Sequence, residues 1–188
     1  MSLIQPKQIL TQLGELSTEE FLRDYWQQKP LLIRQAFPNF QSPLSSDELA
    51  GLACDTDTAR LVLEKGGKTP WEMRHGPLRK KDFAKLPATH WTLLVNDIEK
   101  LLPEFAEMIE PFRFIPDWRI DDLMISYAVD GGSVGPHIDA YDVFLLQAQG
   151  QRRWQISPQT CAEDNFIPDI DLRIMQSFTP EEEWILEP

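Results

Sequence analysis

Residues 131–154 read GGSVGPHIDAYDVFLLQAQGQRRW, and this stretch decides how the chain is interpreted. Its centre is His137-Ile138-Asp139, with a glycine-rich turn before it and an apolar run after it. In an extended strand, side chains two residues apart point to the same face. The imidazole of His137 and the carboxylate of Asp139 can therefore reach one metal ion together.

A metal site on His137 and Asp139 needs a further protein ligand. Two His and one carboxylate on one face of an ion are typical of non-haem Fe(II) oxygenases, which leave the other positions open. The chain has only three His, at positions 75, 90 and 137, so none follows His137. We expect His75 to pack at a strand end and His90 to lie in the first turn of a helix.

A single His-x-Asp triplet is weak evidence, because such triplets arise by chance and most are structural. The neighbouring residues favour a ligand site. Gly131, Gly132 and Gly135 allow the backbone to approach a ligand closely. The apolar run 143–146 predicts a strand that forms a rigid wall beside the site.

The composition indicates a folded protein of one domain. The 188 residues are 42% hydrophobic and include six Trp and ten Phe, which argues against disorder.

No apolar run approaches the ~20 residues that cross a bilayer, and the N-terminus has no signal-peptide pattern, so a cytoplasmic location is expected. Cys54 and Cys161 form no C-x-x-C motif and are expected to be reduced thiols in the interior.

The charge balance is acidic, with 18 Lys and Arg against 30 Asp and Glu and a formal net charge of -12. A phosphate-binding surface gains affinity from cationic side chains, so direct nucleic-acid binding is not expected. A basic polypeptide is a more compatible partner. The alternative, that the acidity serves only solubility, stays open.

Helical signals dominate the first part of the chain. Two S-x-x-E capping boxes, Ser17–Glu20 and Ser45–Glu48, predict helix starts. Apolar residues at helical spacing predict an amphipathic helix from Pro87 to about 102. The helices expected are 4–16, 18–28, 45–54, 87–102 and 104–110.

Strand signals interrupt the helices and then replace them. Residues 59–76 predict a hairpin around the turn 65–68. Further strands are expected at 31–34, 119–129, 143–149 and 153–156, with strand fragments in 172–186. This order predicts an α+β fold in which N-terminal helices brace a curled antiparallel sheet, and a barrel mouth is a common ligand site.

With GPHIDAYDVFLLQAQGQRRW and the upstream PDWRIDDLMISYAV, the chain resembles the JmjC-type cupin oxygenases that use Fe(II) and 2-oxoglutarate. It is most similar to the bacterial ribosomal oxygenases, which hydroxylate an arginine of large-subunit ribosomal protein L-sixteen. The resemblance covers residues 17–188, including WQQKPLLIRQAF and LSSDELAGLA, and is densest at 116–154. It implies a double-stranded β-helix, with 1–115 as N-terminal helices and flanking strands and 116–188 as the first part of the cupin core.

The resemblance also implies roles for individual residues. His137 and Asp139 match two iron ligands. Arg152 matches the basic residue that binds the distal carboxylate of 2-oxoglutarate, a task suited to a planar guanidinium, and Arg153 is expected to face the opposite way. Ser126 is expected to donate its hydroxyl to the same carboxylate. The alternative for Arg152 is a surface arginine after a turn, and the alternative for Ser126 is a small residue packed in the sheet.

Three further residues are candidates for substrate binding. Tyr141 and Asp142 closely follow the metal pair, and a carboxylate there can pair with a substrate guanidinium. Asp130 is a candidate for the same role, although an acidic residue in a turn needs no such explanation.

The family's third iron ligand is a His on a later strand, and this chain departs from that pattern. Its last residues, 184–188, resemble the approach to that strand, and the dimerising helices and winged-helix module of the family have no counterpart. Either the chain is a truncated product or it is a complete cupin that has lost its iron. We favour truncation, because the motif through Arg152 suits its task. In both cases we expect weak iron binding and no activity of this chain alone.

For the intact protein, the resemblance implies a homodimeric protein hydroxylase dependent on Fe(II) and 2-oxoglutarate, whose substrate is an arginine of a basic large-subunit ribosomal protein. A different class of function remains open, a non-catalytic cupin that binds a basic protein segment as an adaptor or chaperone. A metal hydrolase fits less well, because nothing resembles a general base beside the metal pair.

Overall fold

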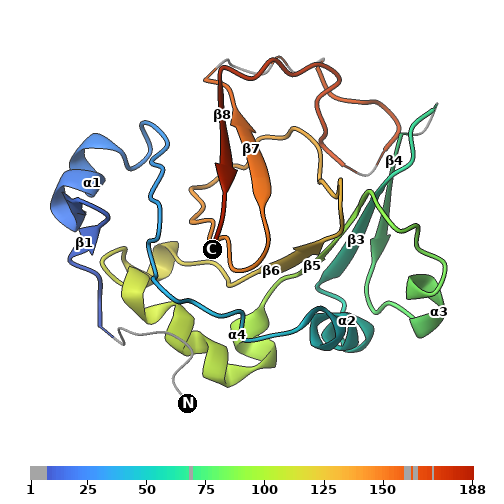
Figure 1. Cartoon of the computed structure of the whole chain (residues 1–188), viewed down its shortest axis with the longest axis horizontal. Coiled ribbons are helices and arrows are strands. Elements are labelled where there is room, and N and C mark those ends of the chain that lie inside the picture. Colours follow the sequence, from blue (N-terminus) through green and yellow to red (C-terminus); the bar gives the residue numbers. More distant parts are fainter. Residues whose placement is uncertain (1–7, 68–69, 159–161, 163–164, 171) are drawn as a thin grey trace.

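A computed structural model describes residues 8–67, 70–158, 162, 165–170 and 172–188 of the chain. Figure 1 shows the arrangement around a four-stranded antiparallel sheet of order β4-β3-β5-β6. The described strands are β1 (Gln12–Leu13), β2 (Leu16–Ser17), β3 (Ala59–Glu64), β4 (Trp71–His75), β5 (Trp91–Val95), β6 (Ile125–Ala128), β7 (Arg152–Ile156) and β8 (Glu182–Leu186). The described helices are α1 (Thr18–Asp24), α2 (Ser46–Asp55), α3 (Lys80–Phe83) and α4 (Ile98–Leu101), with 3-10 helices η1 (Pro103–Met108), η2 (Glu110–Phe112) and η3 (Asp117–Arg119).

The core lies between the four-stranded sheet and the helices on one of its sides. β3 and β5 are antiparallel neighbours, with Leu61 opposite Leu93, and both residues are fully buried. α2 contributes Leu49 and Ala53 to the same cluster, and α4 and η1 contribute Ile98 and Phe105. Figure 1 shows α2 and α4 on this side of the sheet, with the two-stranded sheet of β7 and β8 toward the other side.

Both predicted capping boxes are confirmed. The Ser17 hydroxyl accepts from the backbone N–H of Glu20 at the start of α1, and the Ser45 hydroxyl accepts from that of Glu48 at the start of α2. α2 ends where it was expected. α1 ends at Asp24, earlier than expected, because the chain turns over the next residues and Gln27 adopts a left-handed φ of 59°.

The predicted hairpin at 59–76 is confirmed as β3 and β4. The expected helix at 4–16 is wrong over its described part, because β1 and β2 form a small hairpin around Gly14, whose φ is 62°. Residues 1–7 lie outside the described residues, as does Cys161, whereas Cys54 is half-buried on α2. Residues 31–34 form no strand.

The expected helix from Pro87 to about 102 is also wrong. Residues 91–95 form β5, which pairs with β3 on one edge and β6 on the other. A short apolar run buried in a sheet can match a helical pattern, so periodicity alone does not separate the two. His90 therefore lies in a turn with a φ of 64°, and only α4 is helical in this region.

Three other expectations need correction. Residues 104–110 are 3-10 helix over 103–108 and 110–112, and not one α-helix. The expected strand at 119–129 is paired only over β6. The expected strand at 143–149 does not form, because no strand of the described chain pairs with it. The strands expected at 153–156 and within 172–186 are present as β7 and β8.

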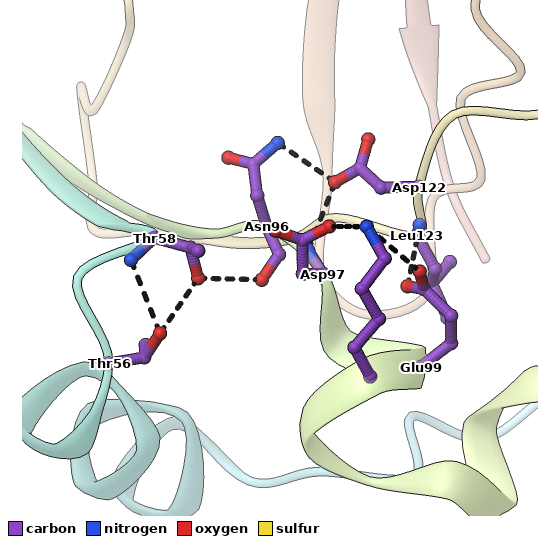
Figure 2. Close-up of polar contacts among 8 residues, drawn as sticks. Thr56, Thr58, Asn96, Asp97, Glu99, Asp122 and Leu123 are labelled. Carbon is purple, nitrogen blue, oxygen red and sulfur yellow. Dashed lines mark hydrogen bonds and ion pairs between the residues drawn. The ribbon is translucent and has the colours of Figure 1, made fainter.

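A polar clasp, made by Asn96, Asp97, Glu99 and Asp122, fixes the start of β6. Figure 2 shows that the Asp122 carboxylate accepts from the Asn96 side-chain amide (2.9 Å) and the Asp97 backbone N–H (3.0 Å). The Glu99 carboxylate accepts from the backbone N–H of Leu123 at 3.0 Å. These bonds hold residues 122–123 against α4 and so bring β6 beside β5.

None of the described helices has the length and apolar character needed to span a bilayer.

Substituting Asp122→Ala tests the clasp. It removes the acceptor for the backbone N–H of Asp97 in a half-buried setting, so we expect the free energy of unfolding to fall by about 1–3 kcal/mol in urea denaturation. The matched control is Asp121→Ala, whose side chain is exposed and which we expect to change stability by less than about 0.5 kcal/mol. Equal losses in the two variants would show that the clasp does not stabilise the fold.

Candidate metal and carboxylate-binding site

The side chains of His137 and Asp139 converge. Nδ1 of His137 lies 2.8 Å from the carbonyl oxygen of Gly135. Because a carbonyl only accepts, Nδ1 must carry the proton and donate it, and the neutral ring then has a free lone pair on Nε2. This Nε2 atom lies 3.6 Å from Oδ2 of Asp139. A hydrogen bond that fixes one ring nitrogen and leaves the other to a metal is typical of metal-binding histidines.

The distance of 3.6 Å between Nε2 and Oδ2 suits two ligands of one ion. It is longer than the ~2.7–3.2 Å of a hydrogen bond. Two donors that each lie about 2.1 Å from one ion, at roughly 90–110° to each other, are about 3.0–3.4 Å apart. A small side-chain adjustment therefore brings both donors to an ion, and an imidazole with a carboxylate suits a first-row transition metal.

The loop before His137 depends on glycine. Gly131 and Gly135 have φ values of 67° and 72°, in the left-handed region. A Cβ atom at Gly135 would lie 2.7 Å from a side-chain carbon of Ile174, which is itself buried. The next residue of that segment, Met175, donates its N–H to the carbonyl of Pro136 at 2.8 Å. Residues 174–175 therefore hold the loop directly before the metal pair.

The segment after the metal pair is held by an aromatic cluster centred on Phe144. Its ring lies 4.8 Å from that of Phe112 and stacks at 6.1 Å on Trp26, measured between centroids. Phe21 and Phe114 complete the cluster at 5.9 and 6.2 Å. This cluster does for residues 143–149 part of what a paired strand was expected to do, because it joins Phe144 to rings of α1 and η2.

The hydrogen bond of Asp142 adds to this attachment. Its carboxylate accepts from the side-chain amide of Gln27 at 3.2 Å, directly after α1. Asp142, a candidate for substrate binding, is thus engaged within the chain. Neither Gln27 nor the aromatic contacts carry any sequence signal of a site, because they join residues that are 30 or more positions apart.

Arg152 lies on β7, opposite Leu186 of β8, and is half-buried, whereas its neighbour Arg153 is exposed. Burial lowers the pKa of Arg152, and its guanidinium makes no hydrogen bond or ion pair within the described part of the chain. A partly buried cation without an anion is costly and marks a candidate ligand site. The expected opposite facing of the two arginines agrees with their burial.

Among the residues that the structure describes, no hydrogen bond or ion pair joins the other predicted residues to Arg152 or to the metal pair. Ser126 is exposed on β6, in a different sheet from Arg152. Tyr141 is 66% exposed, and Asp130 is exposed in a turn where its carbonyl accepts from the N–H of His90 at 2.9 Å. The roles of Ser126, Tyr141, Asp142 and Asp130 stay predictions.

Neither remaining histidine joins the metal pair. His75 ends β4 as expected and is exposed, and the ring of His90 bonds the hydroxyl of Thr89 at 2.8 Å. Within the residues that the structure describes, no three His, Cys, Asp or Glu side chains form a group that could hold a metal ion. The described site therefore offers two protein ligands.

Comparison with known proteins agrees with this fold and motif. Residues 107–188 match the family model of the JmjC domain. The chain is a JmjC-domain protein with the cupin fold, so the resemblance and the α+β fold class predicted from the sequence are confirmed.

The relatives within this class are ribosomal oxygenases. The chain is 46% identical over 142 residues to the ribosomal protein uL16 3-hydroxylase of Escherichia coli. The aligned region covers 75% of this chain and 37% of that protein. It is 42% identical over 159 residues to a probable ribosomal oxygenase of Haemophilus influenzae, with 85% and 39% covered. The chain spans less than half the length of these relatives.

Solved structures give the same result. The crystal structure of E. coli ycfD superposes with a TM-score of 0.82 at 40% identity, covering 96% of this chain and 47% of that chain. A structure of YcfD in complex with cobalt and 2-oxoglutarate gives a TM-score of 0.78 at 40% identity, covering 93% and 44%.

Truncating Phe144 tests the attachment of the motif segment. Phe144 is 40% exposed, but Phe144→Ala removes four ring contacts, so we expect the free energy of unfolding to fall by about 1–2 kcal/mol, measured by urea denaturation with tryptophan fluorescence. The control is Leu145→Ala, because Leu145 is 54% exposed and is expected to cost less than about 0.5 kcal/mol. If Leu145→Ala proved as destabilising as Phe144→Ala, the cluster would not be the anchor.

Proposed function

We propose that this chain provides the metal-binding and 2-oxoglutarate-binding residues of an Fe(II)-dependent protein hydroxylase, whose substrate is an arginine of a large-subunit ribosomal protein. The observation that carries the proposal is the convergence of His137 Nε2 and Asp139 Oδ2 at 3.6 Å, with the imidazole fixed by Gly135. The 46% identity to a uL16 3-hydroxylase supports the choice of reaction and substrate.

The two donors fit iron by their chemistry. His137 offers a neutral nitrogen and Asp139 an anionic oxygen, the mixture found in non-haem iron oxygenases. When bound, Fe(II) supplies the oxygen activation that hydroxylation of a C–H bond needs. The Gly135 carbonyl keeps the proton on Nδ1, so Nε2 stays available as a ligand. Two protein ligands alone are expected to hold the ion weakly.

Arg152 is proposed to bind the distal carboxylate of 2-oxoglutarate. Its guanidinium can make two parallel hydrogen bonds to a carboxylate, and the anion would offset the cost of the partial burial that lowers the pKa of Arg152. Ser126 is proposed to donate its hydroxyl to the same carboxylate. A solved structure of the relative YcfD is in complex with cobalt and 2-oxoglutarate, which supports a metal ion and 2-oxoglutarate as the ligands proposed here.

Substrate recognition is proposed to be electrostatic. Asp130 precedes the metal pair, Tyr141 and Asp142 follow it, and all three lie at the surface. The carboxylates of Asp130 and Asp142 can pair with a guanidinium there. The net charge of -12 favours an arginine- and lysine-rich protein that is captured before it joins RNA. The setting is the cytoplasm, and the intact protein is proposed to be a homodimer with residues 116–188 as the first part of its cupin core.

A second candidate function is a non-catalytic adaptor or chaperone for a basic protein segment. It is supported by the net charge of -12, which suits a basic partner whether or not that partner is oxidised. The two functions differ in a measurable way. An adaptor captures its partner without metal and adds no oxygen atom to the captured chain.

Mass spectrometry of ribosomal proteins tests the proposed reaction. We expect an arginine of a large-subunit protein to carry one added oxygen atom in cells with the unaltered gene and in a His75→Ala control. We expect that oxygen to be lost after gene deletion or after His137→Ala, because the imidazole ligand is gone. An unchanged modification in the His137→Ala cells would refute the assignment, and the absence of any modification difference would favour the adaptor.

A further inference from the structure

The charges of this chain are segregated along its sequence. Residues 74–85, which run from the end of β4 through α3, carry five Lys and Arg against one acidic residue. The remainder carries thirteen Lys and Arg against twenty-nine Asp and Glu. Exposed charges are screened beyond about 10 Å at 0.1 M salt, so a ligand at this segment experiences a local positive field. The acidic total, from which direct nucleic-acid binding was not expected, therefore does not apply to this segment.

The basic segment surrounds a hollow of about 590 Å³ between the end of β4 and α3. Figure 1 shows α3 at the end of the molecule opposite α1 and away from β7 and β8. The hollow is therefore separate from the proposed metal and 2-oxoglutarate site. Its lining residues are Arg74, His75, Pro77, Leu78, Arg79, Asp82 and Lys85.

Two arginines at the rim are held in place by ion pairs. Arg74 donates to the Glu72 carboxylate at 2.5 Å, and Arg79 donates to Asp82 at 3.0 and 3.2 Å. Arg79 and Asp82 form a nearly neutral pair, whereas Glu72 is shared between Arg74 and Lys65. Most of the excess positive charge of the segment therefore lies on its lysines.

Three lysines supply this excess. The ammonium groups of Lys80, Lys81 and Lys85 are exposed and have no ion pair or hydrogen bond with any described residue. They lie within six residues of each other on and directly after α3. Unpaired ammonium groups close together in the chain and beside fixed arginines are suited to binding phosphates.

We propose that the hollow between β4 and α3, which Lys85 lines, binds the phosphodiester backbone of RNA together with the neighbouring Lys80 and Lys81 of α3. An open hollow edged by several cations suits a linear polyanion better than one enclosed small anion. An anionic bilayer fits less well, because the apolar side chains here point inward. Leu78 is buried, and Phe83 and Leu86 pack against the core, so none is available for insertion.

The test is fluorescence anisotropy of a labelled single-stranded RNA oligonucleotide, titrated with the full chain at several salt concentrations. The variant K80E/K81E/K85E reverses the proposed contacts. We expect its affinity to fall by about tenfold or more, and the slope of log affinity against log salt to decrease in magnitude by roughly 2, as three lost phosphate contacts predict. Circular dichroism checks that the fold is retained.

The matched control is K29E/R119E/R173E, which makes the same change in net charge at exposed residues outside the segment. We expect it to retain most of the affinity. Equal losses in the two variants, or no RNA binding by the unaltered chain at low salt, would overturn the proposal. Tighter binding to duplex DNA or to phosphatidylserine vesicles would overturn the choice of RNA. His137→Ala should bind RNA normally, so this proposal and the proposed hydroxylase can fail separately.

Discussion

The convergence of one imidazole and one carboxylate occurs on a segment that no described strand pairs with, and side-chain packing must hold it in place. On one side, Ile174 and Met175 hold the loop that precedes His137. On the other side, Phe144 fixes the residues after Asp139 in a cluster with rings from α1 and η2. Both attachments join residues far apart in the sequence, so the site requires the completed tertiary structure.

The polar interactions have different roles in different parts of the molecule. The clasp around Asp122 satisfies backbone groups where the chain leaves α4 and enters β6, and it is structural. Arg152 is the opposite case, a half-buried cation that has no ion pair or hydrogen bond to its guanidinium among the residues that the structure describes, which is the property expected of a ligand-binding residue. The basic segment 74–85 differs again, because its surplus charge is exposed and local.

Local signals in the sequence predicted local structure well. The capping boxes at Ser17 and Ser45 and the β3–β4 hairpin depend on residues close in sequence, and all three are present. The region 91–102 was predicted as a helix and contains β5 and α4, because its apolar spacing fits a helix while its environment is the middle of a sheet.

The site could be predicted only in part. The two-residue spacing of His137 and Asp139 predicted their convergence, and the structure brings them together. The Gly135 carbonyl that orients the imidazole is two residues from it, and a nearby backbone acceptor has no sequence signature. The strand expected at 143–149 failed because strand formation needs a partner, and an apolar run specifies none.

The central claim is that His137, Asp139 and Arg152 form one site for a metal ion and a dicarboxylate. Calorimetric titration of the chain with 2-oxoglutarate, in the presence and absence of cobalt(II), tests it most directly when Arg152→Ala is compared with Arg153→Ala. The account predicts cobalt-dependent binding that falls by about tenfold or more in Arg152→Ala, because a paired charged hydrogen bond is lost, and is retained in Arg153→Ala. Equal affinities of the two variants, or binding that does not depend on cobalt, would contradict it.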